Sequence, residues 1–396
     1  MNNILNQNLL LKGKRVLLRV DLNVPMKNGA ITETSRIEKI VPTIKLLLEK
    51  QAKIIILSHI GRPKGKVVKG MSLEPISLKL AFLLNKEVLF NKDIINKNTL
   101  SEVNKIPNGS IMMLENIRFN EGEESNDSEF SKKISNLGDI YVNDAFSCSH
   151  RSHASVEGIT KYIPSYFGLQ ITEEINALKK ITSEIKKPVT LIIGGSKIST
   201  KIKIINNLIK KFNNIIIVGG MANTMLKHTG SKVGKSICEN ASGPLIKEIL
   251  ENSNKYNCKI ICPTDVVVSK KLEDIGKKKD IKEIDDDEMI LDIGPKTISS
   301  IKTVINDSNT VLWNGPAGYF ENPNFENGTK QILEIISQKT KNDKIFSVAG
   351  GGETVAAINK FKKLDSFTFV STAGGAFLEY LEGKTLPGIK ALNQNV

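Results

Sequence analysis

The sequence predicts an α/β protein with two domains of similar size, each a mainly parallel doubly wound sheet, joined by a helix. Two observations support this fold class. The chain has 396 residues, which is too long for one ordinary core, and 40% of them are apolar, which is enough for two. Short β-branched runs also alternate with helical patterns in both halves, and this alternation is typical of crossover units in a parallel sheet.

The joining helix has the strongest periodicity in the chain. Its apolar residues recur at steps of three and four, at Ile171, Ile175, Leu178, Ile181 and Ile185. Thr172 is expected to cap it, and Pro188 to end it. The predicted organisation is therefore a first domain over 1–170, a connecting helix over 171–187, a second domain over 188–380, and a segment over 381–396 that returns to the first domain.

In the first half, five apolar runs of four to six residues indicate buried parallel strands. They are Val16–Val20, Ile54–Ser58, Val88–Phe90, Ile111–Leu114 and Ile140–Asn143. Polar and basic residues follow several of these runs. Because ligands of open parallel sheets bind beyond the carboxyl ends of the strands, these residues predict one cationic site for a small polyanion.

Arginine is rare enough to be informative. Of 56 lysines and arginines only six are arginine, and all six precede the joining helix. Lysine, asparagine and isoleucine have adenine- and thymine-rich codons, so mutational bias alone can explain much of the lysine. Arginines that remain should mark positions needing a planar fork that grips phosphate or carboxylate at two points. Arg15, at a strand start, is the best candidate for a purely structural ion pair.

The second half places glycine where its strands end. Gly-containing turns follow the predicted strands Val189–Ile193, Ile215–Val218, Met289–Ile293, Val311–Trp313, Ile345–Val348 and Phe367–Val370. Such turns let backbone amides approach phosphates, and helices that begin there direct their positive dipole ends at the same ligand. Any single glycine pair could be an ordinary tight turn, but six aligned on one sheet edge predict a nucleotide site.

Several other classes of function are disfavoured. The net charge of +14 could attract nucleic acid, but aromatics are only 5% of the chain and the lysines are scattered. A nicotinamide-dependent dehydrogenase would need a Rossmann fingerprint, and a P-loop enzyme a Walker A loop; neither is complete here. Filter binding at physiological salt and an assay for NAD binding would test the first two alternatives.

The remaining composition points to a protein of the reducing cytoplasm. No apolar run approaches the roughly 18 residues that cross a bilayer, and no export signal is evident. The four cysteines are too few and scattered for a disulfide framework. Cys148, His150 and His153 have spacing that could suggest a metal site, yet basic loop residues or packing explain them better.

Eight segments together resemble the phosphoglycerate kinase family, in order and nearly end to end. They are Arg19–Pro25, Ser58–Gly65, Leu114–Arg118, Val142–Ser155, Gly194–Lys201, Trp313–Glu321, Gly350–Thr354 and Leu378–Gly388. The resemblance implies a cytoplasmic, monomeric glycolytic kinase of two domains. It would move phosphate reversibly between 1,3-bisphosphoglycerate and magnesium ADP, giving 3-phosphoglycerate and ATP after hinge closure.

The resemblance also implies roles for individual residues. Those expected on the phosphoglycerate are Asp21, Leu22, Asn23, Arg36, His59, Ile60, Gly61, Arg62, Arg118 and Arg151. Those expected on the nucleotide are Lys201, Glu321, Gly350, Gly351, Gly352 and Glu353, with Glu353 also the ligand of Mg²⁺. The catalytic group is expected to comprise Arg36, Lys197, Gly374 and Gly375.

Three positions depart from the family pattern. Glu353 stands where the family usually has aspartate, and Ala373 replaces the first glycine of a triple. Ser147, Cys148 and Ser149 replace smaller residues. Glu353 is expected to reach magnesium directly or through water, and Ala373 removes one position of close backbone approach while Gly374 and Gly375 remain. The expected mechanism depends mainly on positioning and on electrostatic stabilisation of the charge spread over the phosphoryl group. The carboxylate of 3-phosphoglycerate is already a nucleophile and needs no general base.

Overall fold

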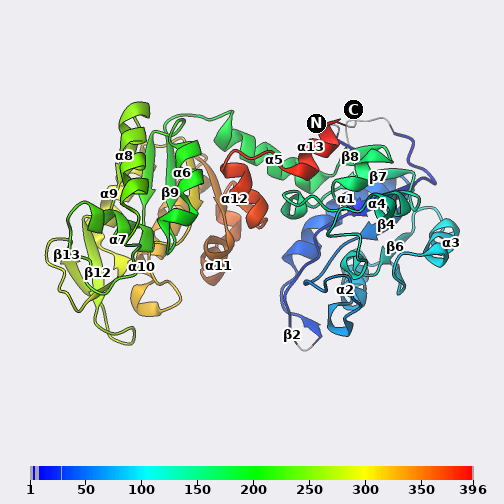
Figure 1. Cartoon of the computed structure of the whole chain (residues 1–396), viewed down its shortest axis with the longest axis horizontal. Helices are drawn as coiled ribbons and strands as arrows, with labels where there is room; N and C mark the ends of the chain where they lie inside the picture. The colour runs from blue at the N-terminus through cyan, green and yellow to red at the C-terminus, as the bar shows by residue number, and fades with distance from the viewer. Residues whose placement is uncertain (1–2, 5–8, 28, 395–396) are drawn as a thin grey trace. The chain divides into compact units, whose positions relative to one another are not determined.

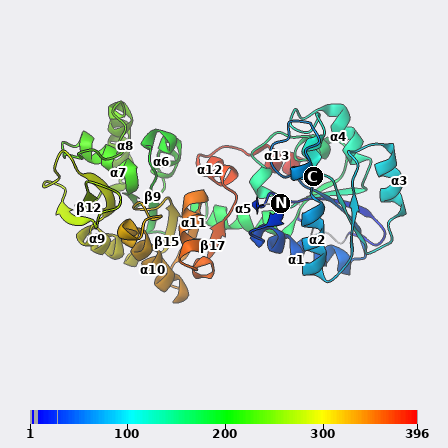
Figure 2. The same cartoon turned by 90° about the horizontal axis from the view of Figure 1, so that it is seen from below.

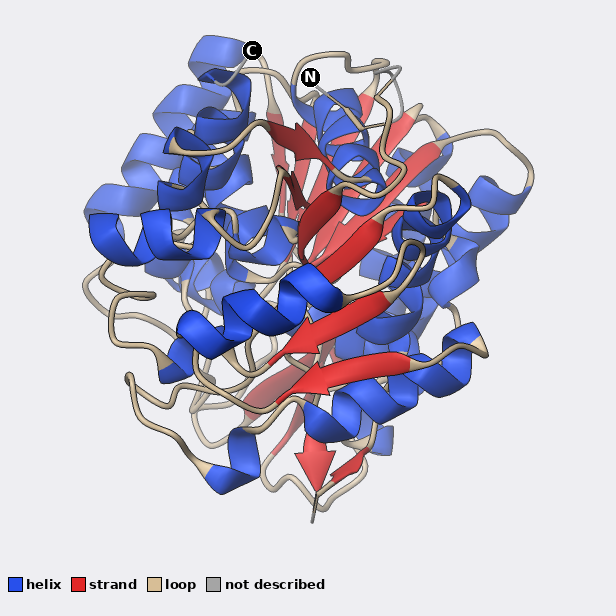
Figure 3. Ribbon diagram, turned by 90° about the vertical axis from the view of Figure 1, so that its right-hand side faces the viewer, coloured by secondary structure: helices blue, strands red, loops and turns tan. Residues whose placement is uncertain are grey.

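A computed structural model describes residues 3–4, 9–27 and 29–394. The chain divides into two compact units: residues 1–176 with 385–396 form the first unit, and residues 177–384 form the second. Each unit has its own six-stranded parallel sheet, so the predicted α/β class with two parallel-sheet domains is confirmed. In Figure 3 the strands, drawn in red, lie between layers of helices, drawn in blue.

The sheet of the first unit has the strand order β5-β6-β4-β1-β7-β8, and all neighbours are parallel. The strands of this unit are β1 (Arg15–Arg19), β2 (Met26–Lys27), β3 (Ala30–Ile31), β4 (Lys53–Leu57), β5 (Val88–Asn91), β6 (Ile111–Leu114), β7 (Ile140–Asn143) and β8 (Ser165–Phe167). β2 and β3 form a separate two-stranded ribbon. The five predicted strands therefore exist within one residue at each end, whereas β8 was not predicted from the sequence.

Helices cover both faces of this sheet. They are α1 (Ser35–Glu49), α2 (Glu74–Leu84), α3 (Lys97–Lys105), α4 (Ser128–Ser135) and the 3-10 turns η1 (Lys69–Met71), η2 (Ile117–Phe119), η3 (Phe146–Cys148) and η4 (Gly158–Lys161). Figure 2 shows α1 and α2 on one side of the sheet and α3 and α4 on the other. This arrangement follows from right-handed crossovers, since the chain moves along the sheet in one direction through α1 and α2 and then reverses.

The sheet of the second unit has the order β11-β10-β9-β15-β16-β17, again parallel throughout. Its strands are β9 (Val189–Ile193), β10 (Asn214–Ile217), β11 (Lys259–Ile261), β15 (Thr310–Asn314), β16 (Phe346–Gly350) and β17 (Phe369–Ser371). The helices are α6 (Ile202–Leu208), α7 (Gly219–His228), α8 (Gly243–Tyr256), α9 (Pro295–Asn306), α10 (Asn327–Lys341), α11 (Gly352–Lys360) and α12 (Gly375–Leu381), with η5 (Ile198–Thr200), η6 (Pro323–Phe325) and η7 (Leu364–Ser366). Figure 2 shows α6 and α8 on one side, and α9 and α10 on the other.

One predicted strand lies elsewhere. The prediction aligned Met289–Ile293 with the parallel strands, but it is β14 of a second, antiparallel sheet ordered β13-β12-β14. Its partners are β12 (Asp265–Ser269) and β13 (Lys277–Asp280). Only five of the six predicted glycine-bearing strand ends therefore lie along the edge of the parallel sheet. An apolar run specifies a strand, whereas its partners depend on tertiary contacts that the pattern does not encode.

The helix between the units differs from its prediction at both ends. α5 runs from Leu169 to Thr182, so it starts earlier and ends five residues before Lys187. At its start, the Ile171 amide donates to Asp144 Oδ1 (3.0 Å), while Thr172 lies inside the helix and donates its hydroxyl to the Gly168 carbonyl (2.6 Å). The amino end of α5 is thus capped by Asp144, which is distant in the sequence, and not by Thr172 as predicted.

The segment after α5 is held by the second unit and does not continue the helix. The carbonyl of Lys186 accepts a hydrogen bond from Thr310 Oγ1 (2.8 Å), and that of Lys187 accepts one from Asn309 Nδ2 (2.6 Å). These side chains, next to and at the start of β15, hold the carbonyls in an extended connection. The predicted end at Lys187 was therefore wrong, because local helix signals compete with tertiary hydrogen bonds.

The end of the chain packs on the first unit. α13 (Pro387–Gln394) follows the second unit directly, and the Gly388 amide donates to the Ser149 carbonyl (2.9 Å). Figure 1 shows α13 beside β8. Among the described residues no helix has the length and apolar content that a membrane span requires. The four cysteines, all of them described, are free thiols.

Candidate functional site

The expected phosphoglycerate residues follow neighbouring strands of the first sheet. β4, β1 and β7 are adjacent, and β6 lies beside β4. Asp21, His59, Arg118 and Arg151 come just after β1, β4, β6 and β7 respectively. Because the strands are parallel, these carboxyl ends meet at one sheet edge. We call this edge, with Arg36 at the start of α1, the first-unit site.

Arg36 is fixed by the loop that follows β1. Its Nη1 donates to Asp21 Oδ2 (2.6 Å) and to the Asn23 carbonyl (3.2 Å). The Asn23 side chain in turn accepts a hydrogen bond from the Gly61 amide (3.0 Å), which ties this loop to the one after β4. The Leu22 amide donates to Ser58 Oγ (3.0 Å) at the same junction. The guanidinium is therefore positioned before any ligand binds.

Arg118 is the deepest of the expected phosphoglycerate arginines. Only 2% of it is exposed, and its Nη1 donates to the Gly61 carbonyl (2.7 Å). The neighbouring Asn116 side chain donates to the carbonyl of Ile60 (2.8 Å), which fixes the loop that carries His59. Burial and the positive charge of Arg151 both lower the pKa of Arg118, which indicates an excess of positive charge suited to an anionic ligand.

The remaining two arginines are less constrained. Arg151 is half-buried, and its Nε lies 3.4 Å from His150 Nε2. Arg62 is exposed in the loop after β4. The structure therefore brings Asp21, Asn23, Arg36, Gly61 and Arg118 into one hydrogen-bonded set. It leaves Arg62 outside that set.

His59 has the most perturbed environment in the first-unit site. Burial lowers its pKa well below the usual 6.5, and the charges of Arg19, Arg118 and Arg151 lower it further. The imidazole is therefore neutral at physiological pH. It can donate one hydrogen bond to an anion, but it adds no charge.

A group of possible metal ligands occurs here, and its chemistry argues against a metal. Ligand atoms of Asp21, His59 and Cys148 lie within 4.8 Å of one another. Arg36 already donates to the Asp21 carboxylate, and Arg19 donates to the His59 ring and to the Cys148 sulfur. A cation would have to displace two guanidinium groups from a positively charged pocket, so these residues suit an anion instead.

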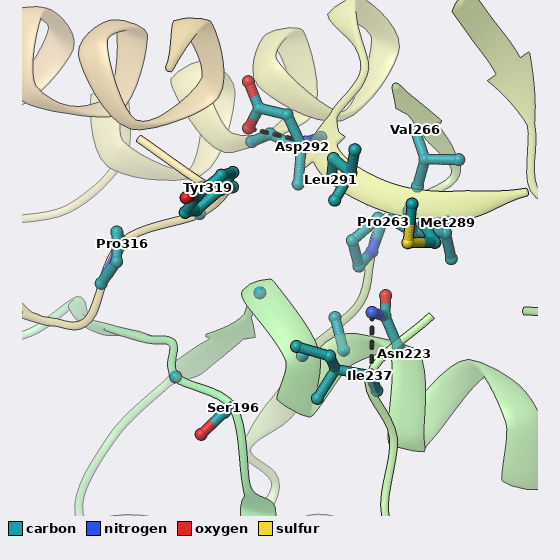
Figure 4. A pocket seen from close by; sticks show the side chains of 18 of the residues that line it. Ser196, Asn223, Ile237, Pro263, Val266, Met289, Leu291, Asp292, Pro316 and Tyr319 are labelled. Atoms are coloured by element: carbon teal, nitrogen blue, oxygen red, sulfur yellow. Dashed lines mark hydrogen bonds between the residues drawn. The ribbon is translucent and has the colours of Figure 1, made fainter. Parts of the chain in front are cut away.

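The second unit contains a cavity of about 470 Å³ between its parallel and antiparallel sheets. Its lining includes Gly195 after β9, Gly219 at the start of α7 and Gly318 after β15, together with Glu321 and Glu353. Apolar side chains make up much of the remaining wall, and Figure 4 shows several of them, including Ile237, Pro263, Val266, Met289, Leu291 and Tyr319. A mostly apolar cleft with a few polar groups is typical of a binding site for a small molecule.

Glycine at two of these strand ends is required by the close approach of backbone to backbone. A Cβ on Gly194 would lie 2.3 Å from the Pro316 carbonyl oxygen, and one on Gly315 would lie 2.3 Å from that of Gly194. Gly315 also has φ +109°, which L side chains rarely adopt. The turns after β9 and β15 therefore pack directly on each other beside the cavity.

Lys201 is held at the centre of the sheet edge. Its Nζ donates to Asn314 Oδ1 at the end of β15, and the Asn314 Nδ2 donates to the Gly350 carbonyl (2.6 Å) at the end of β16. Burial lowers the pKa of Lys201, while the carboxylate of Glu353 opposes that shift. Lys201 and Glu353, which lie far apart in the sequence, are therefore electrostatic neighbours.

Some of the residues expected to bind the nucleotide line this cavity, and others do not. Glu321 and Glu353 line the cavity and are exposed. Lys197, Lys201, Gly350, Gly351, Gly352, Gly374 and Gly375 are not among the residues that line it. Gly352 and Gly375 instead begin α11 and α12, whose amino ends carry the positive dipole that attracts phosphate.

Comparison with known proteins decides the family. The sequence profile described as "Phosphoglycerate kinase" matches residues 6–384. The chain belongs to the phosphoglycerate kinase family. The phosphoglycerate kinases of Chelativorans sp. and Rhodopseudomonas palustris are 46% and 47% identical to it, each match covering 96% of both chains. The solved phosphoglycerate kinase of Coxiella burnetii superposes with a TM-score of 0.90 at 39% identity, covering 98% of both chains.

Membership makes the protein a glycolytic kinase, a phosphotransferase with a carboxyl acceptor, as the resemblance implied. Sequence reasoning did not identify the apolar wall of this kinase's cavity, nor Asn314 and Asp292. Asp292 lines the cavity and accepts hydrogen bonds from the amides of Ile293 (2.8 Å) and Gly328 (2.6 Å). Figure 4 shows it beside Tyr319. An acidic residue in an apolar strand, Leu291-Asp292-Ile293, was the available signal.

Proposed function

We propose that this kinase transfers a phosphoryl group reversibly between 1,3-bisphosphoglycerate and magnesium ADP, giving 3-phosphoglycerate and ATP. One observation supports this assignment most directly. The edge of the first sheet presents arginine side chains, and the edge of the second presents close-packed glycine turns beside an apolar cavity. The first suits a small ligand with phosphate and carboxylate groups, and the second suits a nucleotide.

In the first unit, 3-phosphoglycerate binds to the expected residues by charge and by shape. Arg36 is held by Asp21 and Asn23, and Arg118 by Gly61, so both guanidinium groups are oriented before the substrate arrives. Preorganised donors lower the cost of stabilising charge during the reaction. Arg62 and Arg151 have fewer constraints and bind the exposed end of the substrate.

In the second unit, the cavity takes the base and sugar, and the amino ends of α11 and α12 face the phosphates. Lys201 neutralises phosphate charge from its position on Asn314. Glu321, on the cavity wall, accepts hydrogen bonds from the sugar hydroxyls.

Glu353 suits a magnesium ligand. Its carboxylate is exposed, lines the cavity and lies in the first turn of α11, and hard oxygen donors are what Mg²⁺ prefers. When bound, Mg²⁺ neutralises charge on the nucleotide phosphates. The longer glutamate side chain would hold the metal directly or through one of the waters that Mg²⁺ usually keeps.

Catalysis follows from positioning and charge. The charge on a phosphoryl group in flight spreads over three oxygens, and Arg36, Lys197 and the amides of Gly374 and Gly375 supply donors for them. Gly374 has φ +57°, a conformation that turns the backbone sharply before α12. The attacking carboxylate belongs to the substrate, so no residue of the chain has to remove a proton.

The two substrates bind to different units, and the reacting atoms must come within about 3–3.5 Å of each other. Turnover therefore includes a closing motion, with α5 and the segment after it as the hinge, which also excludes water. Solution scattering should give a smaller radius of gyration with both substrates bound than with neither. The enzyme works as a monomer in the cytoplasm.

A coupled assay tests the proposal. Purified protein should form ATP from 1,3-bisphosphoglycerate and ADP when Mg²⁺ is present, and lose that activity when the metal is chelated. Activity unchanged by chelation would remove the metal from the proposal. Absence of ATP formation by folded protein would contradict the reaction itself.

A further inference from the structure

A buried chain of hydrogen bonds lies beneath the first-unit site. Glu123, in the loop before α4, is fully buried, and its carboxylate accepts from the Ser155 hydroxyl (2.7 Å) and amide (2.9 Å). The Ser155 hydroxyl in turn accepts from Arg19 Nε (3.0 Å). Arg19, the last residue of β1, is also fully buried. A buried carboxylate and a buried guanidinium are thus linked through one serine.

The far end of this chain is His59. Arg19 Nη2 lies 3.2 Å from His59 Nδ1. A guanidinium nitrogen can only donate, so Nδ1 must accept the hydrogen bond, and the single proton of a neutral imidazole must then sit on Nε2. The direction of every hydrogen bond from Glu123 to His59 is therefore fixed by the chemistry of the groups.

We propose that Glu123, Ser155 and Arg19 are positioning residues that hold His59 as the neutral Nε2–H tautomer, so that this ring nitrogen offers a hydrogen-bond donor to the phosphoglycerate. The inference rests on the proposed function for the identity of that ligand. The hydrogen-bond chain itself does not depend on it.

Each residue of this hydrogen-bond chain has a separate structural role. Arg19 carries a charge that burial would disfavour, and Glu123 supplies the compensating negative charge. Glu123 also contacts His153, whose Nδ1 lies 3.6 Å from its carboxylate. Tyr141 donates its hydroxyl to the Ser155 carbonyl (2.7 Å), which fixes the backbone that presents the serine. These hydrogen-bonded side chains are therefore held in place, as they must be to keep His59 in a single tautomer.

The charges around His59 favour the same protonation state. The groups that face it come from β1 and the loop after it, from η2, from η3 and from the loop after η3, and they are Arg19, Asp21, Arg118, Cys148, Arg151 and His153. The three guanidinium groups oppose a positive imidazole, and Arg19 occupies the nitrogen that would have to gain the second proton. Protonating His59 would break its bond to Arg19.

Nitrogen NMR of the imidazole rings in the full-length, ligand-free enzyme tests the inference. The chain has only four histidines, so a His59→Gln variant assigns the signal. The wild type should show one Nε2–H tautomer that does not titrate between pH 5.5 and 8. Arg19→Gln and the milder Ser155→Ala should each abolish that preference. Arg15→Gln, at the other end of β1 where Arg15 pairs with Asp139 (2.8 Å), should not.

Kinetics provide the second measurement. Ser155→Ala should raise KM for 3-phosphoglycerate about tenfold, the scale of one misplaced hydrogen bond, and leave KM for ATP unchanged. The inference would be overturned by an Nδ1–H tautomer of His59 in the wild type or by a titration midpoint of His59 near the ordinary histidine pKa. It would also be overturned if the ring nitrogen signals of His59 in folded Arg19→Gln matched those of the wild type. If the tautomer results hold but KM does not move, the chain of hydrogen bonds is right and the assignment of its ligand is wrong.

Discussion

The two units are built on the same kind of sheet but present different parts of the chain at the strand ends where we propose that their ligands bind. The first uses side chains: Arg36 and Arg118 are held by neighbouring carboxylates and carbonyls. The second uses the backbone: Gly194 and Gly315 bring two strand ends into direct contact beside the cavity. All six arginines precede α5, so the second unit has none.

One buried acid from each unit also shows how a partner decides the pKa of a carboxyl group. Burial alone would raise the pKa of Glu123 in the first unit, but the nearby imidazole of His153 (3.6 Å), the charge of Arg19 and the hydrogen bond from Ser155 outweigh it and hold that pKa below its usual value. In the second unit, burial raises the pKa of Asp292 to about 7, and the hydrogen bonds from the amides of Gly328 and Ile293 oppose only part of that shift. The difference lies in the partner and not in the unit, because burial also raises the pKa of Asp144 in the first unit to about 6.

The largest expected effect separates arginine from lysine in the first unit. Arg36→Lys should lower turnover on the order of 10²-fold, because the lysine ammonium cannot reproduce the fork that binds Asp21, Asn23 and substrate together. Arg15→Lys is the matched control, since Arg15 pairs with Asp139 and donates to Asn104 and Asn136 at the opposite end of β1. Steady-state kinetics of both variants would check this. Full activity of Arg36→Lys would contradict the hypothesis that the few arginines of this sequence are kept because they bind the substrate.

A smaller effect is expected for the metal ligand of the second unit. Glu353→Ala should weaken activation by Mg²⁺ at least about tenfold, the scale reported for groups that support a metal site, because a hard oxygen donor is lost. Glu353→Asp should keep or improve it. Titrating activity against free Mg²⁺ measures the change. If the alanine variant responds to Mg²⁺ like the wild type, the metal is held by other groups.

Close packing of backbone on backbone should make the second unit sensitive to a single methyl group. Gly194→Ala would place a Cβ 2.3 Å from the Pro316 carbonyl oxygen, so it should destabilise the protein by about 1–3 kcal/mol. Gly352→Ala meets nothing within 4 Å and should change stability by no more than about 0.5 kcal/mol. Thermal unfolding compares them. Equal losses would mean that close approach is not what selects glycine at 194.

The smallest effect is a pair of opposite pH dependences. The lowered pKa of Glu123 means that its stabilisation is present above the unfolded value of about 4.5 and is lost as pH falls through the folded pKa. The raised pKa of Asp292 means that its contribution is full below about 4 and is lost as pH rises through about 7.

The free energy of unfolding in urea, measured from pH 4 to pH 8, distinguishes the contribution of Glu123 from that of Asp292. The advantage of wild type over Glu123→Gln should grow with pH, and its advantage over Asp292→Asn should shrink, each by an amount on the order of 1 kcal/mol. Parallel trends for the two variants would show that the partners of Glu123 and Asp292 do not set opposite pKa shifts.

Much of the fold could be predicted because it depends on local pattern. The runs at 111–114 and 140–143 were found to the residue, since a strand buried on both faces is continuously apolar. The site residues Asp21, Arg36 and Arg118 could be named because strand ends of a parallel sheet converge. The hydrogen bonds that hold them could not, since Asn23 meets Gly61 only after two strands have paired.

The sequence by itself determined the two α/β units, the arginine and glycine ends of their strands, and the resemblance that led to the family. These follow from periodicity, residue type and order along the chain, which are local quantities. Tertiary structure alone decided that β14 leaves the parallel sheet, that Asp144 caps α5 and that the helix stops at Thr182. It also joined Glu123 to His59 through Ser155 and Arg19. Each of these depends on a partner far away in the sequence, and a hydrogen bond between distant residues leaves no periodic pattern to read.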